Sequence, residues 1–193
     1  VDVYLHHPVE RFVHRGEALC YLSENSEHME SSVRRNIKIG DLRTFEQDPR
    51  FGLIVLGEIG SKALSAGIND PGTAIDIIGR MTRILDSYRS EMDAVRDGDP
   101  AHPRLHVPIL AASDLIEDSF GPIARDGVSV VEVQVTLQQA LAAIMHHPEE
   151  TLADAAAEAA AVAFSRAEDS VTNDFDLKRI RDAMSIADDP DRR

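Results

Sequence analysis

Apolar and polar positions alternate at the start of the chain, beginning with Val1, Val3 and Leu5. Two apolar stretches then lie on either side of His14-Arg15-Gly16, a sequence suited to a turn. A period of two is typical of strands, because successive side chains of a strand point to opposite faces. The pattern predicts a small β segment over residues 1–24.

Helical spacing replaces this alternation further along the chain. It is weak over residues 26–39, and Gly40 is a candidate end for that helix. Thr44 with Gln47 forms a possible capping box, and Asp48-Pro49 is a second possible helix start, since proline suits the first helical position. A helix is therefore predicted to begin in this stretch.

Residues 51–63 have apolar side chains at helical spacing but include Gly52, Gly57 and Gly60. A glycine inside a helix costs about 1 kcal/mol relative to alanine, so three of them favour close packing against a neighbouring helix. After a short corner comes the clearest amphipathic stripe of the chain. It is made by Ala74, Ile77, Ile78, Met81, Ile84, Leu85 and Tyr88.

Caps mark three more helices in the second half of the chain. The first covers about residues 113–125 and ends at Gly127. A capping box of Ser129 and Glu132 precedes the second. The third is alanine-rich and runs from Pro148 to about Ser170.

The remaining segments complete the expected fold. Prolines and charges predict a loop or variable insertion over residues 94–108, and Asn173 caps a last short helix. The fold class is therefore mostly α (α+β), with five or six helices and a short N-terminal β segment. The expected organisation is a small β segment at residues 1–24, a helical domain at 25–187 and a disordered tail at 188–193.

Composition narrows the possible functions. With 43% hydrophobic and 28% charged residues, the 193-residue chain falls in the globular range and can bury one core. Its net charge of −14 argues against duplex nucleic acid as a partner, because phosphate contacts need a basic face. The only cysteine, Cys20, lies among apolar residues and is expected to be a small core residue. No stretch is long and apolar enough to span a bilayer.

The corner over residues 65–74 (SAGINDPGTA) raises the question of whether it performs chemistry. In the structural interpretation, Gly67 ends one helix in the left-handed conformation. Asn69 or Asp70 is then the N-cap of the next helix, and Pro71 is its first residue. This interpretation gives every position of the motif a role.

In the functional interpretation, the exposed amides that follow Pro71 bind an anion together with the Thr73 hydroxyl. The carboxylate of Asp70 works against this, because a capping side chain occupies the same amides. The sequence therefore favours the structural interpretation.

A second candidate involves charged residues on the two helices beside the corner. Glu58 lies near the apolar face with Lys62 one turn later, and an ion pair between them is the simpler interpretation. The alternative is a buried polar cluster of Glu58, Asp70, Asp76 and Arg80 that titrates or binds a ligand. No catalytic residue is assigned. The candidate ligand-binding residues are Asn69, Asp70, Thr73, Glu58 and Arg80.

The eight histidines do not form an H-E-x-x-H motif. His102 and His106 have helical spacing, but Pro103 disfavours a helix there. His146-His147 follow a predicted helix, where a cation favours the dipole, so capping is preferred to metal binding. No metal is predicted. No cofactor is predicted either, because P-loop, G-x-G-x-x-G and G-x-S-x-G motifs are absent and no lysine precedes Lys38 to carry lipoate.

A family resemblance rests on residues 43–53 (RTFEQDPRFGL) and 63–74 (ALSAGINDPGTA). These two runs closely resemble the signature of the bacterial predicted membrane proteins called domain of unknown function 2254. Residues 11–22 (RFVHRGEALCYL) and 114–141 resemble other parts of the family, so the resemblance covers nearly the whole chain. Two positions depart from the family pattern, with Gly72 where an aromatic residue is usual and Glu10 near the place of a glycine.

The resemblance implies that a few N-terminal transmembrane helices precede this soluble part. The expected partners are therefore the protein's own transmembrane helices, and the expected location is the bacterial inner membrane with this domain facing the cytoplasm. The family implies no activity. The chain is expected to be a piece of a longer protein.

The favoured function is a non-enzymatic regulatory, assembly or ligand-sensing domain for those membrane helices, with a possible homo-oligomer. The alternative is a membrane-tethered, hydrolase-like enzyme that uses Asn69, Asp70 and Thr73 with Glu58 or Arg80. A third possibility is a scaffold for another protein. A pocket holding those polar groups would favour the enzyme, whereas an exposed apolar patch on the β segment or the glycine-rich helix would favour assembly.

Overall fold

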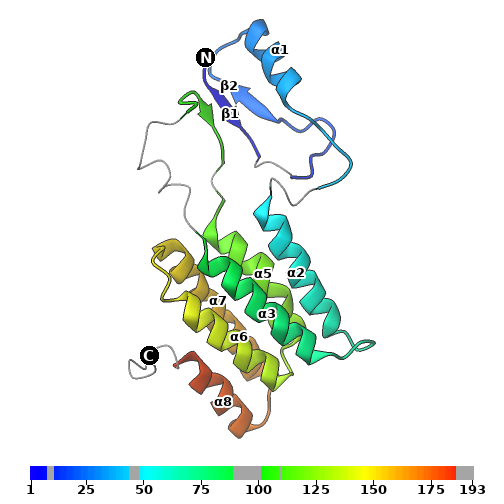
Figure 1. Ribbon diagram of the computed structural model, residues 1–193, viewed down its shortest axis with the longest axis vertical. Helices are drawn as coiled ribbons and strands as arrows, with labels where there is room; N and C mark the ends of the chain where they lie inside the picture. Colours follow the sequence, from blue (N-terminus) through cyan, green and yellow to red (C-terminus); the bar gives the residue numbers. More distant parts are fainter. Residues whose placement is uncertain (8–10, 44–47, 89–100, 109, 186–193) are drawn as a thin grey trace. The chain divides into compact units, whose positions relative to one another are not determined.

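The structure, a computed structural model, describes residues 1–7, 11–43, 48–88, 101–108 and 110–185. Seven helices and three short strands lie in this part of the chain (Figure 1). The predicted mostly α fold with a short N-terminal strand segment is confirmed. The possible capping box at Thr44 and Gln47 and the tail at 188–193 lie outside the described residues.

The chain forms two compact units. Residues 1–51 and 90–110 make up the first, called here the strand unit, and residues 52–89 and 111–193 make up the second, the helical unit. Residues 25–51, which the sequence pattern grouped with the helices, belong to the strand unit.

The strand unit is built on a three-stranded sheet of β1 (Val3–Leu5), β2 (Cys20–Leu22) and β3 (Leu105–His106), in the order β2-β1-β3. β1 pairs antiparallel with β2 and parallel with β3. The sequence pattern missed β3 and placed it in the predicted loop over residues 94–108. A two-residue strand is too short to show an alternation of apolar and polar positions.

In the strand unit, α1 (Glu27–Asn36) follows β2 along the chain. Ser26 is its N-cap and accepts a hydrogen bond of 3.3 Å from the Met29 amide. The helix stops before Gly40, the residue expected to end it, because Ile37 already has an extended backbone at φ −87° and ψ 123°.

Six helices form the helical unit (Figure 1). They are α2 (Pro49–Ala63, from Gly52 onward), α3 (Pro71–Asp86), α5 (Ala112–Asp126), α6 (Val131–Ile144), α7 (Glu150–Ser170) and α8 (Asp174–Met184). α6 packs against α3, α7 and α8, and α5 packs against α7. α6 is thus the central helix, and its buried residues contact the core from several sides.

The core confirms most of the predicted stripe on α3. Ala74, Ile77, Ile78, Met81 and Leu85 are buried. Ile84 lies at the edge of the stripe and is 45% exposed. Two residues of the core that no apolar pattern predicts are Gln134 and Gln138 of α6, both fully buried.

The glycines of α2 allow the close packing expected from the sequence. A Cβ atom on Gly57 would lie 2.6 Å from the carbonyl oxygen of Asp118 in α5. A Cβ atom on Gly60 would collide with the side chain of Ile123, which also belongs to α5. Gly52 has open space around it, so it has no packing role there.

Capping is partly as predicted. Asp48 accepts a hydrogen bond of 3.1 Å from the Phe51 amide at the start of α2, which confirms the Asp48-Pro49 start. The capping box of Ser129 and Glu132 is wrong, because α6 begins after Val130 and has no side-chain cap. The turn before it is closed by the backbone instead, with the Val130 amide donating to the Gly127 carbonyl at 3.0 Å.

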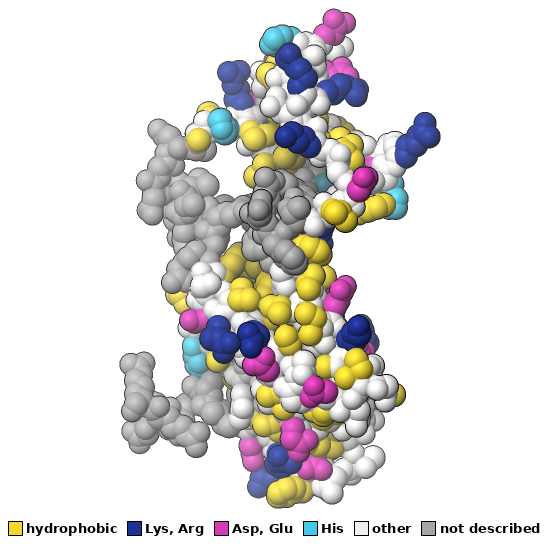
Figure 2. Space-filling model, turned by 45° about the vertical axis from the view of Figure 1, so that its right-hand side comes forward, with side chains coloured by type: hydrophobic (Ala, Val, Ile, Leu, Met, Phe, Trp, Pro, Cys, Tyr) yellow, Lys and Arg dark blue, Asp and Glu magenta, His cyan; other side chains and the backbone are white. Residues whose placement is uncertain are grey.

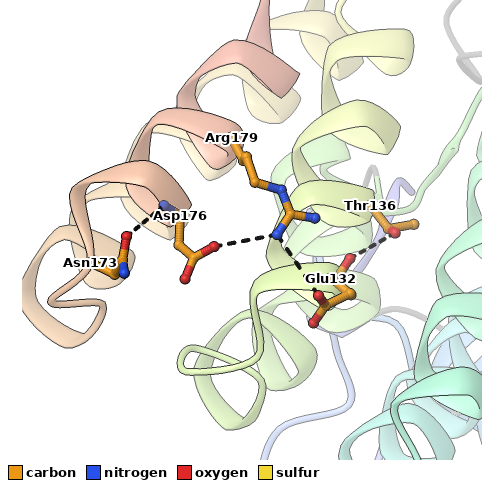
Figure 3. A network of polar contacts seen from close by, with 5 residues as sticks. All are labelled: Glu132, Thr136, Asn173, Asp176 and Arg179. Carbon is orange, nitrogen blue, oxygen red and sulfur yellow. Dashed lines mark hydrogen bonds and ion pairs between the residues drawn. The ribbon is translucent and has the colours of Figure 1, made fainter.

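Glu132 faces α8, where it joins a surface network (Figure 3). The guanidinium of Arg179 lies 3.3 Å from Asp176 and 3.9 Å from Glu132. Asn173 caps α8 as predicted, since its side-chain oxygen accepts from the amides of Phe175 and Asp176.

Candidate functional site

The corner between α2 and α3 is held by its own side chains. The Asp70 carboxylate accepts a hydrogen bond of 3.1 Å from the Thr73 amide and one of 2.6 Å from the Thr73 hydroxyl. The Asp70 amide donates to the Ala63 carbonyl at the end of α2, at 2.8 Å. Both ends of the corner are therefore tied by Asp70, and Pro71 begins α3 as predicted.

Asn69, and not Gly67, has the left-handed conformation at this corner, with φ 51°. The prediction for Gly67 is therefore wrong. The chain makes further turns over residues 65–68 before it reverses direction, so the left-handed residue comes later, and asparagine tolerates that conformation better than most residues. A Cβ atom at Gly72 would lie 3.3 Å from an Asp70 carboxylate oxygen, so an aromatic residue at position 72 would press on the cap.

Hydrogen bonds from the Thr73 hydroxyl and then from the Thr73 amide lower the pKa of Asp70 below its usual value of 3.8. These donors favour the ionised form. The Thr73 amide and hydroxyl, which would bind the anion in the functional interpretation, are thus engaged by a carboxylate that stays charged.

Asp70→Ala is expected to lower the melting temperature by a few degrees, because the Thr73 amide and hydroxyl lose their acceptor. Asp70→Asn keeps an oxygen acceptor and should lose less. A lowered pKa contributes stability above the unfolded pKa, and this contribution disappears as pH falls through the lower folded pKa. The difference between wild type and Asp70→Asn should therefore shrink below about pH 4. Thermal unfolding over a pH series measures it, and a difference that grows in acid would contradict the assignment.

The other candidate residues do not join the corner in a buried cluster. Asp76 and Arg80 form an ion pair of 2.6 Å on the surface of α3, with side chains 59% and 56% exposed. Glu58 is exposed on α2, and among the described residues it has no ion pair with Lys62. The structure brings Asp70 to Thr73 and Asp76 to Arg80, and it leaves Glu58 apart.

A polar contact that the sequence did not predict lies beside the corner. The Ser61 hydroxyl of α2 donates to the Asp126 carboxylate at the end of α5. This hydrogen bond, followed by contacts with Arg125, lowers the pKa of Asp126. The two residues are distant in sequence, so only the tertiary packing of α2 on α5 brings them together.

The described residues of the helical unit include two hollows. A groove of about 200 Å³ lies between α5 and α7, and its lining includes the apolar Phe120 and Leu141 and the charged Glu117 and Glu158. A smaller one of about 150 Å³ lies between the ends of α3 and α6 beside His147. None of the predicted candidate residues lines either hollow.

His146-His147 were predicted to cap the end of the preceding helix, but the ring of His147 bonds to the segment that follows it. This residue is buried, and its ring Nδ1 accepts a hydrogen bond of 3.1 Å from the Glu149 amide. It therefore supports the start of α7 as an acceptor. In the part of the chain that the structure describes, no three His, Cys, Asp or Glu side chains converge as a metal site would need. Cys20 is half-buried on β2.

Comparison with known proteins gives a family match. The family model described as "Predicted membrane protein (DUF2254)" matches residues 1–143. The chain is also similar to Uncharacterized protein Rv1290c of Mycobacterium tuberculosis and Uncharacterized protein Mb1321c of Mycobacterium bovis. Each is 30% identical over 112 residues, which cover 57% of this chain and 22% of the relative.

The chain thus spans about a fifth of the length of the relatives it matches. No solved structure matches it. Within the described residues, every helix is too short or too polar to cross a membrane.

Proposed function

Since the chain belongs to the DUF2254 family of predicted membrane proteins, we propose that it is a non-catalytic assembly domain with a regulatory role in a bacterial inner-membrane protein. Its partners are the protein's own N-terminal transmembrane helices and further copies of itself, on the cytoplasmic side. The corner supports a structural role, because Asp70 is engaged by Thr73 and Ala63.

The outward side of α2 is the observation that carries the assembly role. Ile59 is 44% exposed there, and Val55, one turn earlier, is only half-buried. Figure 2 turns the α2 side of the helical unit forward and shows hydrophobic side chains gathered over it. An exposed apolar strip on a helix is typical of an interface.

Charges beside this strip favour a second copy as the partner. Glu58 and Lys62 are both exposed, one turn apart, and do not pair with each other. If two α2 helices lie antiparallel about a two-fold axis near residue 60, Glu58 of each faces Lys62 of the other. Ile59 then meets its counterpart near the axis. A two-fold interface must be self-complementary, and this arrangement is.

Light scattering over a concentration series tests the proposal. We expect a dimer for the wild type, and we expect Lys62→Glu to weaken it about tenfold or more, because like charges then face each other twice. The double variant Glu58→Lys/Lys62→Glu exchanges the charges and should restore the dimer. Lys178→Glu, on α8, is the matched control and should leave the dimer intact.

Two light-scattering results would contradict this proposal. A monomer at every concentration would contradict assembly through this chain. A dimer that Lys62→Glu weakens and the double variant does not restore would contradict the antiparallel pairing of α2.

A further inference from the structure

Two aliphatic side chains stand out from the segment that follows α1. Ile39 is 73% exposed and Leu42 is 85% exposed. The segment has no helix or strand of its own after Ile37, so it forms a loop in the strand unit. Single exposed apolar residues are common on protein surfaces, but two within four positions of one loop call for an explanation.

Cations accompany this loop. Arg35 and Lys38 are exposed, and neither forms an ion pair with a residue that the structure describes. Arg34 is also exposed but is paired with Glu30 at 2.7 Å. One acidic residue, Asp41, lies between the two aliphatic side chains. The loop therefore presents apolar side chains beside unpaired positive charge.

A second loop of the strand unit has the same character. Phe12 is 77% exposed, and its immediate neighbour Arg11 and the nearby Arg15 are exposed as well. The Phe12 ring lies edge-on to the His14 ring, at a centroid distance of 5.0 Å. An exposed aromatic residue between arginines repeats the combination seen at Ile39 and Leu42.

Charge is divided unevenly between the two units. Over its full sequence, the strand unit has nine Lys and Arg against 13 Asp and Glu, whereas the helical unit has 11 against 21. Figure 2 shows Lys and Arg side chains gathered over the unit that contains α1. An anionic surface would thus repel the helical unit more strongly than the strand unit, where the cations at Arg35 and Lys38 can meet it.

We propose that the loop over residues 37–42, together with Phe12, docks on a bilayer that contains anionic phospholipids. Ile39, Leu42 and Phe12 enter the boundary between headgroups and acyl chains. Arg35 and Lys38 lie at the level of the phosphates. Apolar insertion beside cations is the combination by which peripheral proteins hold anionic membranes. This goes beyond the assembly role, because lipid binding by a single chain does not depend on the α2 interface.

Co-sedimentation of the 193-residue chain with vesicles is the test. We expect binding to vesicles of phosphatidylcholine and phosphatidylglycerol, little binding to phosphatidylcholine alone, and weaker binding at high salt. Each unit of charge is worth about fivefold in partition. Lys38→Glu, a change of two units, should therefore reduce binding about 25-fold. Ile39→Ser/Leu42→Ser should reduce it about tenfold.

Phe175→Ser is the matched control, because Phe175 is 70% exposed on α8 of the more acidic helical unit. It should bind vesicles like the wild type. The chain has no tryptophan, so Leu42→Trp adds a single reporter whose emission should shift to shorter wavelength with anionic vesicles. Phe175→Trp should show no such shift. Circular dichroism confirms that each variant is folded.

The results separate this proposal from the assembly role. Failure of the folded wild type to bind anionic vesicles would overturn it, and so would equal binding by the wild type and the two loop variants. If the folded wild type does not bind anionic vesicles, a partner protein is the expected cover for this loop. The oligomeric state from light scattering is unaffected by either.

Discussion

Gly57→Val is expected to lower the free energy of unfolding by about 3 kcal/mol, whereas Gly52→Val in the same helix should change it by less than about 1 kcal/mol. The two positions differ in what a side chain would meet. A Cβ atom on Gly57 would lie 2.6 Å from the Asp118 carbonyl oxygen and 3.0 Å from that of Ser119. One on Gly52 would meet nothing within 4 Å.

The obstacle at Gly57 is backbone, which cannot turn aside as a side chain does. The valine must therefore push α2 away from α5, and this loses contacts along the whole helix pair. Gly60→Ala should have an intermediate effect, because the atoms it meets belong to the flexible side chain of Ile123. Urea denaturation of the variants measures these differences. Equal losses at Gly52 and Gly57 would show that the contact of α2 with α5 does not set the cost.

This packing explains why the close contact of α2 with another helix could be predicted from its glycines. Glycine is costly in a helix, so its repeated use indicates a compensating contact, and the structure provides one for Gly57 and Gly60. The caps at Asp48, Asp70 and Asn173 could also be predicted from the sequence. Each satisfies amides only two or three residues away, so local sequence is sufficient.

Features that depend on residues distant in the sequence could not be predicted in this way. The capping box at Ser129 and Glu132 has the right spacing but does not form, because the turn from α5 into α6 is closed by backbone. The sequence also left open, as the alternative to an ion pair of Glu58 with Lys62, a buried cluster of Glu58, Asp70, Asp76 and Arg80. Whether two helices turn these side chains toward each other depends on their packing, and here Asp76 and Arg80 pair on the surface instead.

The corner shows both sides of this limit. Asp70 and Pro71 were placed correctly, because capping is local. The left-handed residue was assigned to Gly67 from its conformational freedom, yet Asn69 adopts that conformation. The path of the chain between the two packed helices decides which residue is left-handed. The conformational preferences of single residues do not determine that path.

The buried glutamines of α6 were missed because polar residues normally indicate an exposed face. Gln134 and Gln138 are both fully buried, one turn apart, and the side-chain oxygen of each has no hydrogen-bond partner among the described residues. Their nitrogens differ. Gln134 donates to the carbonyls of Ala124 and Gly127 at the end of α5, at 3.3 and 3.1 Å. Gln138 donates to the Ala160 carbonyl in the middle of α7, at 3.1 Å.

Gln134→Leu is therefore expected to lower the free energy of unfolding by about 2 kcal/mol, because the buried Ala124 carbonyl in the last turn of α5 loses its side-chain donor. Gln138→Leu should be neutral or stabilising. The Ala160 carbonyl still serves the hydrogen-bond ladder of α7, and the substitution also removes a buried oxygen that lacks a partner.

Urea denaturation of the two leucine variants tests this contrast directly, since they share residue type, helix, burial and volume change. A loss at Gln138 as large as that at Gln134 would mean that the cost comes from fitting leucine into the core. The predicted asymmetry would mean that the end of α5 is held by a side chain from the central helix. In that case Gln134 fixes the turn that follows α5, and Gln138 contributes little to stability.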